Sequence, residues 1–148
     1  MMTYKSGHFW VGKTSFVLPE GSLIDSDYPV DPFFGFVLHP PDMSYRIEFQ
    51  FCPEDGDARQ SMEKDLSELS KKPTIQRVKY SCGEGWATMY STCRNKCYDL
   101  RFDISPVEIE NGQVLNMLNI LTYVDLKVNM EDVLQGEYFQ ALINGIQI

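Results

Sequence analysis

The segment from Tyr98 to Ile104 places the strongest constraint on the fold of this chain. Apolar residues alternate with charged ones along it without a break, and the charged positions are Asp99, Arg101 and Asp103. A period of two residues predicts a β-strand with one buried face and one face in water. We therefore expect the three charged side chains to form an outer surface of a sheet, paired across strands.

This strand is the last of three that residues 74–105 predict. Strand-forming runs at 74–80 and 86–93 are joined by the glycine-containing corner 82–85, and a short turn leads into the alternating strand. Three strands joined by short connections predict an antiparallel meander.

The turn before the alternating strand can close in two ways. If residues 95–96 form a two-residue turn, in which Asn95 tolerates a positive φ, Trp86 and Tyr90 lie on the face opposite Leu100. We prefer this register for its turn chemistry. Trp86 and Tyr90 then need cover, either from a helix of this chain or from a partner.

A three-residue loop is the alternative. Cys93 and Cys97 then stand opposite one another, and Trp86 and Tyr90 turn towards the core. This register buries more aromatic area and permits a Cys93–Cys97 disulfide. The sequence leaves the two registers, and the bridge, open.

The rest of the chain is organised around this meander. We expect residues 45–51 to neighbour the alternating strand, with two helices covering the sheet. The other predicted elements are an N-terminal strand bent at Gly12 (residues 7–18), a hairpin of residues 33–38 with 45–51, a helix over 57–72 with Asp57 as N-cap and Gln60 as its capping-box partner, a loop at 106–112, a strand over 114–124 and a helix capped by Asn129 and ending at Gly145.

Length and composition indicate one α+β domain. A chain of 148 residues with 43% hydrophobic residues can bury a core without disulfides or metals. We expect a mainly antiparallel sheet of about six or seven strands under two helices, with no domain boundary within residues 1–148.

The net charge of −8 argues against nucleic acid as a partner, because phosphate backbones would be repelled. From residue 14 to residue 45 the chain has no lysine or arginine, so we expect a negative field there. The sequence starts without a signal-peptide pattern and has no window long enough for a membrane span, so we expect no membrane insertion and a cytoplasmic location.

The residues that could carry chemistry form no recognised motif. We expect four reduced cysteines, of which only Cys93 and Cys97 are closely spaced, and no metal site or cofactor. We interpret His39 as an exposed loop residue and His8 as a half-buried packing residue. No Ser or Cys is predicted beside a base, so the sequence favours a protein that is not an enzyme.

The order of elements also carries a family resemblance. The chain resembles the Mog1/PsbP-like group, including its DcrB-like members, in the order of its elements. These are an early Ser15–Gly21 run with a Pro-Glu-Gly corner, a hairpin, a helix, a meander and a closing helix ending Ala141–Ile146. The resemblance covers nearly the whole chain. It implies an antiparallel sheet with packed helices, and a binding module without a shared catalytic set.

These inferences together predict a protein-binding module, an adaptor or chaperone of a bacterial secretion or envelope system. The partner is unidentified and the oligomeric state is open. The expected partner surface comprises Trp86, Tyr90, Tyr28, Phe33 and Phe34, since exposed aromatic side chains beside charges are typical of interaction hot spots. The alternative is a small-molecule-binding protein or enzyme that uses a cleft beside the acidic 20–42 segment.

Overall fold

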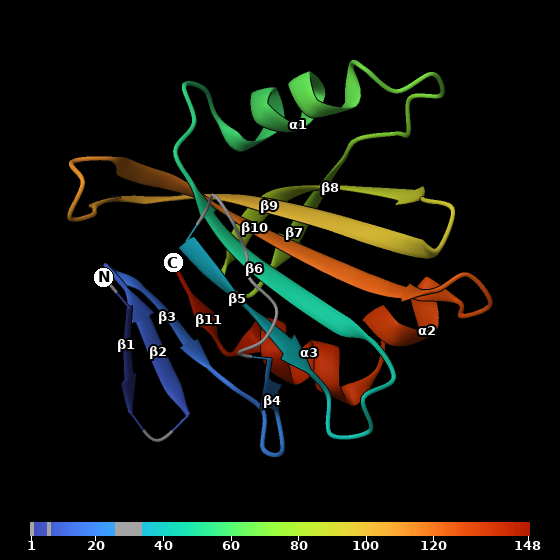
Figure 1. The fold of residues 1–148 in the computed structure, drawn as a ribbon, viewed down its shortest axis with the longest axis horizontal. Helices are drawn as coiled ribbons and strands as arrows, with labels where there is room; N and C mark the ends of the chain where they lie inside the picture. Colours follow the sequence, from blue (N-terminus) through green and yellow to red (C-terminus); the bar gives the residue numbers. More distant parts are fainter. Residues whose placement is uncertain (1, 6, 26–33) are drawn as a thin grey trace.

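A seven-stranded antiparallel sheet forms the centre of the computed structural model, which describes residues 2–5, 7–25 and 34–148 (Figure 1). The strand order is β4-β5-β6-β10-β9-β8-β7. The strands are β4 (Leu23–Ile24), β5 (Phe34–His39), β6 (Arg46–Cys52), β7 (Gln76–Tyr80), β8 (Gly83–Ser91), β9 (Asn95–Glu108) and β10 (Val114–Asp125).

A second antiparallel sheet and three helices complete the fold. The sheet has the order β1-β2-β3-β11 and consists of β1 (Met2–Lys5), β2 (His8–Val11), β3 (Thr14–Val17) and β11 (Ile146–Gln147). The helices are α1 (Ala58–Leu66), α2 (Met130–Leu134) and α3 (Glu137–Asn144). The predicted α+β class is confirmed, whereas the expectation of one sheet under two helices omitted the second sheet and one helix.

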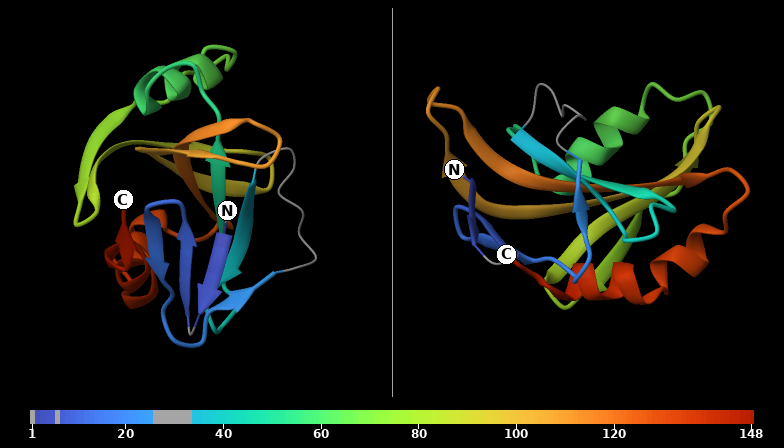
Figure 2. Two further views of the ribbon diagram at one scale, coloured as in Figure 1. Left: turned by 90° about the vertical axis from the view of Figure 1, so that its left-hand side faces the viewer. Right: turned by 60° about the horizontal axis from the view of Figure 1, so that its bottom comes forward.

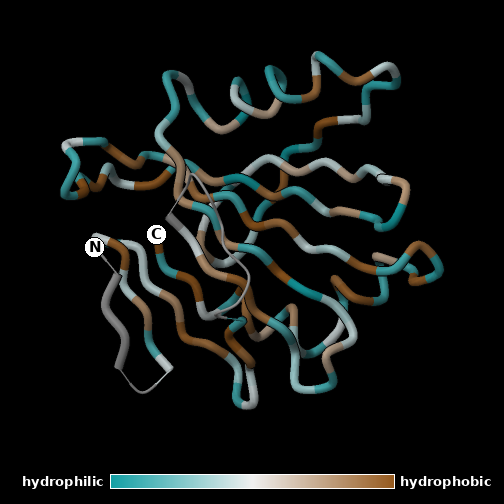
Figure 3. The backbone as a smooth tube through the Cα atoms, viewed as in Figure 1, coloured by the Kyte–Doolittle hydropathy of each residue, from teal (hydrophilic) through white to brown (hydrophobic). Residues whose placement is uncertain are grey.

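The elements lie in layers on either side of the large sheet. Figure 2 shows α1 on one face, and the small sheet with α2 and α3 on the other. The face towards α2 and α3 carries the main apolar core, and Figure 3 shows the alternation of hydrophobic and hydrophilic residues along the strands. Alternate side chains of each strand point to opposite faces. The side chains that do not enter the main core therefore lie on the face that carries α1.

Phe16 joins the small sheet to the large one. Its ring is fully buried, and its centroid lies 5.8, 5.2 and 6.0 Å from those of Phe36, Phe49 and Phe51, with the rings edge to face. Edge-to-face pairs at this spacing add to the burial energy of aromatic side chains. Phe16 therefore anchors β3 against β5 and β6.

The N-terminal segment folds as a hairpin, so the predicted single bent strand is wrong. Phe9 pairs with Phe16, and the chain reverses at Gly12, whose φ is +60°. A Cβ placed on Gly12 would lie 2.2 Å from Cγ2 of Val107. Glycine is required here both by the left-handed backbone and by the contact with β9.

The turn between β8 and β9 forms two residues earlier than predicted. The amide of Thr92 donates to the carbonyl of Asn95 at 2.8 Å, which places Cys93 and Arg94 at the tip. The hydroxyl of Thr92 also accepts hydrogen bonds from both of the following amides, those of Arg94 and Asn95. Because side chains alternate with a period of two, moving the turn by two residues leaves each side chain on the same face of the sheet. The predicted turn is therefore wrong, but the prediction that Trp86 and Tyr90 lie on the face opposite Leu100 is confirmed.

Strand β10 lies between the two strands that were expected to be neighbours. Phe49 of β6 and Leu100 of β9 both pair with Ile120 of β10. The prediction of a strand over 114–124 is confirmed, and the hairpin of β5 with β6 is confirmed as well. The predicted loop at 106–112 is wrong in part, because β9 continues to Glu108.

Helix α1 begins as predicted and ends early. The Asp57 carboxylate accepts from the Gln60 amide, and the Gln60 side chain accepts from the Asp57 amide, so the capping box is confirmed. The helix stops at Leu66 and not near residue 72. The Ser67 hydroxyl donates to the Lys64 carbonyl at 2.6 Å, a local bond of the kind that competes with helix continuation.

The C-terminal helix is broken in two by Gly136. Asn129 caps α2 as predicted, but Gly136 has an extended backbone and begins α3. Glycine favours such a break because its helix propensity is low. The bend lets Phe139, Leu142 and Ile143 of α3 bury against the main core.

Candidate functional site

Two of the five residues predicted for a partner surface lie together in the structure. Trp86 and Tyr90 project from the same face of β8, the face towards α1, and both are half-buried. Phe34 begins β5 and its backbone pairs with Phe51, but its side chain lies outside the described part of the structure, as do Tyr28 and Phe33. The structure therefore places only the β8 half of the predicted surface.

Helix α1 covers Trp86. The guanidinium carbon of Arg59 lies 4.7 Å from the centre of the Trp86 ring, a cation–π contact. Arg59 is held in turn by Glu63, one helical turn further along α1, at 2.8 Å. Of the two sources of cover considered for Trp86, a helix of this chain supplies it.

Two of the three charged side chains predicted to form an outer face of β9 are buried, so that prediction is wrong for Asp99 and Arg101. Asp99 is 2% exposed and Arg101 is 5% exposed, because α1 lies over both. Asp103, at the margin, remains exposed and accepts a hydrogen bond from the Ala58 amide at the start of α1. Alternation alone cannot distinguish a solvated charged face from one covered by a helix.

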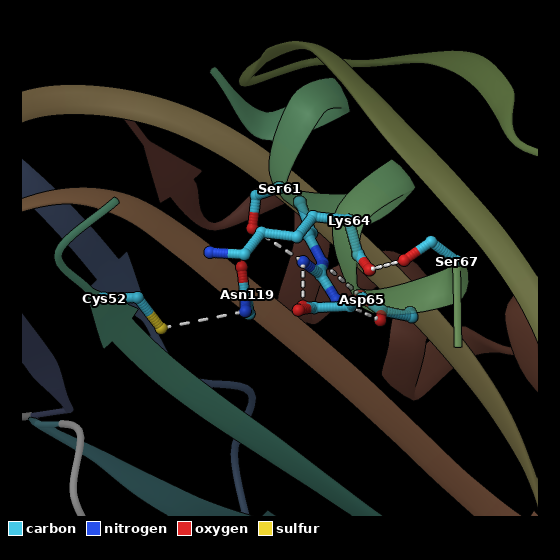
Figure 4. Close-up of polar contacts among 8 residues, drawn as sticks. Cys52, Ser61, Lys64, Asp65, Ser67 and Asn119 are labelled. Carbon is cyan, nitrogen blue, oxygen red and sulfur yellow. Dashed lines mark hydrogen bonds and ion pairs between the residues drawn. The ribbon is translucent and has the colours of Figure 1, made fainter. Parts of the chain in front are cut away.

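Arg101 is the centre of a buried polar network, of which Figure 4 labels the α1 residues Ser61 and Asp65. Its guanidinium donates to both carboxylate oxygens of Asp99, at 3.0 and 2.9 Å. It also donates to the Ser61 hydroxyl at 2.9 Å and to Asp65 at 2.8 Å, both on α1. Burial lowers the pKa of Arg101, but the hydrogen bonds and charges of Asp99 and Asp65 more than offset this, so its pKa lies above the ordinary value.

The network satisfies Arg101 and fixes α1 to the sheet. Four donor contacts to three partners leave the guanidinium little capacity to bind a ligand. Two carboxylates surround one buried cation, and all three groups lie in an ordered, hydrogen-bonded arrangement. We interpret this site as structural: it sets the position of α1 and of the loop that follows.

A cysteine and an amide lie beside this network. The Asn119 amide nitrogen lies 3.7 Å from the sulfur of Cys52, and the Asn119 carbonyl oxygen has no hydrogen-bond partner among the described residues (Figure 4). Burial raises the pKa of the Cys52 thiol to about 12. The thiol is therefore protonated at neutral pH and is a poor nucleophile.

Cys97 is equally inert. It is fully buried between Tyr90 and Tyr123, its pairing partners on the two neighbouring strands. Burial raises the pKa of Cys97 to about 12. All four cysteines are free, and Cys93 is exposed at the turn whereas Cys97 is buried, so the disulfide that the second register permitted is not formed.

A broad open groove adjoins Tyr90. Its volume is about 720 Å³, and it lies between the loop that follows α1 and the end of β8. The lining residues are Leu69, Ser70, Lys71, Lys72, Pro73, Met89, Tyr90, Ser91 and Thr92. Leu69 is 41% exposed and Met89 is 44% exposed, which is high for apolar side chains of this size.

The sequence reasoning found Tyr90 and missed the other side of the groove. The helix predicted over 57–72 included Leu69 and, at its end, Lys71 and Lys72. The helix ends at Leu66, so all three residues lie instead on an irregular loop. The serines at 67 and 70 were the available signal, because serine side chains favour helix ends over helix interiors.

A smaller hollow lies beside the acidic 20–42 segment. It measures about 450 Å³ and is lined by residues of three regions: Pro40, Pro41, Asp42, Tyr45, Asp132, Val133, Gly136, Glu137 and Tyr138. No histidine or cysteine is among these lining residues. The acidic side chains at its rim have no basic counterpart in the lining.

His39 was interpreted as an exposed loop residue, and this is wrong. It is the last residue of β5, and its side chain is 15% exposed. Its two ring nitrogens lie 3.2 Å from the Asp25 carboxylate and 3.2 Å from the Tyr45 carbonyl. The described residues contain no group of three or more His, Cys, Asp or Glu side chains arranged to hold a metal ion.

Comparison with known proteins identifies no relative of this chain. No protein-family model matches the chain, and searches of curated proteins and of solved structures find no match. Within the described residues, no helix has both the length and the apolar character needed to cross a bilayer. The function is therefore inferred from the geometry of the site.

Proposed function

We propose that this chain is a protein-binding module whose contact surface is the groove between residues 69–73 and residues 89–92. The observation that carries the proposal is that Leu69 and Met89 are exposed and line the groove together with the half-buried Tyr90. Apolar and aromatic side chains gathered in an open concavity are typical of surfaces that bind another polypeptide.

Two further features support binding and not catalysis. The buried thiols of Cys52 and Cys97 are held protonated. The buried guanidinium of Arg101 is paired with Asp99 and Asp65 and is not free to act on a ligand. The groove is also only partly enclosed, whereas small-molecule sites enclose most of their ligand. A role as adaptor or chaperone, as the Mog1/PsbP-like resemblance implies, is part of the proposal.

The alternative function would use the hollow beside the acidic 20–42 segment. Tyr45 and Tyr138 contribute apolar area there, with ring centroids 6.3 Å apart. Its described lining residues include no histidine, cysteine, lysine or arginine, and His39, which contacts the Tyr45 carbonyl, is already bonded to Asp25. We therefore favour the groove.

Site-specific crosslinking tests the proposal. Benzophenone-alanine at Met89 should crosslink a defined protein when the chain is expressed in its own host. The same probe at Val114 is the control, because this side chain is 46% exposed and its residue pairs with Glu108, at the end of β9 that is remote from the β8–β9 turn. We expect a product from position 89 that Leu69→Asp abolishes.

Two results would count against the groove. One is an identical set of products from positions 89 and 114. The other is the absence of any product at position 89 in a protein that circular dichroism shows to be folded.

A further inference from the structure

The outer edge of β8 is only partly paired. Strand β7 pairs with β8 from Tyr80 opposite Gly83 to Gln76 opposite Ala87. Strand β8 continues to Ser91, so its last four residues, Thr88–Ser91, extend beyond the start of β7. This open edge forms one wall of the groove.

The chain that precedes β7 does not fill the gap. Pro73 has no amide hydrogen and cannot donate to a neighbouring strand. Among the described residues, the only hydrogen bond from this segment to the end of β8 comes from a side chain. The Thr88 hydroxyl donates to the Thr74 carbonyl at 2.9 Å. Residues 69–73 instead run along the far wall of the groove.

The hydrogen-bond pattern identifies the backbone groups that face outwards. The Thr92 amide donates to Asn95, so in an antiparallel pair Tyr90 and Thr88 also direct their backbone groups towards β9. Met89 and Ser91 therefore direct theirs to the open edge. No described backbone group outside β9 bonds to either residue. Unpaired donors and acceptors in a row are a template for another strand.

The charge of the groove differs from that of the chain as a whole. The chain carries a net charge of −8, yet Lys71 and Lys72 line the groove and no acidic residue is among its described lining residues. Arg94 lies in the adjoining turn and is exposed. A ligand with carboxylate side chains is favoured here, and one with lysines is not.

We propose that the groove binds an acidic, extended peptide segment, which adds to the sheet as a strand along Thr88–Ser91. The segment would exchange backbone hydrogen bonds with Met89 and Ser91. One set of its alternating side chains would meet Leu69, Tyr90 and the two lysines. This proposal rests on the proposed function, since it specifies the partner and the binding mode of the same groove.

The dimensions of the edge fit a short linear motif. At about 3.4 Å per residue, four strand residues span roughly 14 Å, which a segment of about four to six residues covers. Strand addition supplies affinity through the backbone and specificity through alternate side chains.

A displayed library of random linear heptapeptides tests the proposal. The selected sequences should be enriched in Asp and Glu, with apolar residues at alternate positions. Charge reversal by Lys71→Glu with Lys72→Glu should weaken binding of a selected peptide at least tenfold, whereas the same change at Lys13 and Lys127 should leave it within twofold. When the selected peptide is N-methylated at one backbone amide at a time, binding should be abolished at every second position and retained at the positions between.

A proline substitution tests the edge itself. Ser91→Pro removes an outward-facing amide that β9 does not use, and edge strands tolerate proline at such positions. It should abolish peptide binding, whereas Ser91→Ala should leave binding within threefold. If Ser91→Pro unfolds the chain, the lysine reversal and the N-methyl series still decide the result.

The outcomes separate the binding mode from the function. A groove-dependent crosslink at Met89, combined with peptides that lack acidic residues or are indifferent to N-methylation, would overturn strand addition and leave the binding function intact. Failure to select any peptide, together with the loss of the crosslink, would overturn both. A dimer that Ser91→Pro converts to monomer would show that the edge pairs with a second copy of this chain, and would overturn the acidic-peptide assignment.

Discussion

The carboxylate of Asp99 accepts two hydrogen bonds from the guanidinium of Arg101, at 3.0 and 2.9 Å, from a position two residues earlier on the same strand. Both side chains point towards α1, where Asp65 and Ser61 complete the network. A single strand thus carries an ion pair under a helix that it also holds in place. The first prediction follows from this burial.

Replacing Arg101 by methionine should destabilise the fold by about 3–5 kcal/mol, because the buried Asp99 carboxylate would lose its partner. Urea denaturation measures the change. Arg77→Met is the control: its pair with Glu84 is exposed and should contribute less than about 1 kcal/mol. The double substitution Asp99→Leu with Arg101→Met should recover at least half of the loss; equal losses at Arg77 and Arg101 would contradict the interpretation.

Thr122→Val should stabilise the protein by about 1–2 kcal/mol, because it removes a buried hydroxyl that has no hydrogen-bond partner among the described residues. The side-chain volume hardly changes. Thr88→Val is the matched comparison, since the Thr88 hydroxyl donates to the Thr74 carbonyl and its loss should cost about 1 kcal/mol. Thermal melts of the two variants should shift in opposite directions, and a shared direction would refute this reading.

Stability should fall as the pH rises above 9. Burial raises the pKa of Cys52 and of Cys97 from 9.0 to about 12. The folded thiols keep their protons where the unfolded chain has lost them, so their contribution is complete below pH 9 and is lost between pH 9 and about 12. Urea midpoints measured from pH 7 to 11 test this. The Cys52→Ala, Cys97→Ala double variant should show a shallower alkaline slope than the parent, and an unchanged slope would assign the effect to other groups.

Asp57→Ala should reduce stability by about 1 kcal/mol, because it removes the capping-box acceptor for the Gln60 amide. Asp55→Ala, two residues earlier and outside the cap, should cost less than about 0.5 kcal/mol. Since α1 carries Asp65 to Arg101, hydrogen exchange of the α1 amides should also accelerate in the first variant and not in the second. Equal exchange rates in the two variants would show that the cap does not contribute to the docking of α1 on the sheet.

The faces of the central strands could be predicted from the sequence, and their cover could not. Alternation at 98–104 indicated the strand and its apolar side correctly. The opposite side was predicted to be solvated, because nothing near Arg101 in the sequence shows that Asp65 on a distant helix will neutralise it. Pairing of this kind depends on tertiary structure, which a local pattern does not contain.

The groove shows a similar division. Tyr90 was identified because side chains alternate between the two faces of a strand. An error of two residues in the position of the turn therefore left Tyr90 on the correct face. Leu69 and the two lysines were missed because the end of α1 was placed several residues too late. Helix ends depend on local side-chain bonds, such as that of Ser67, which compete with the apolar pattern.

The pairing of β6 with β10 has a consequence for how the chain reaches this fold. Cys52 lies opposite Met117, so two neighbours on adjacent strands are 65 positions apart in the sequence. The β5–β6 hairpin and the β8–β9–β10 meander can each form from nearby residues, but their union must wait for a long loop to close. Folding should therefore be slow for a chain of this length, on the order of milliseconds to seconds, with the seam between β6 and β10 closing after both of these units have formed.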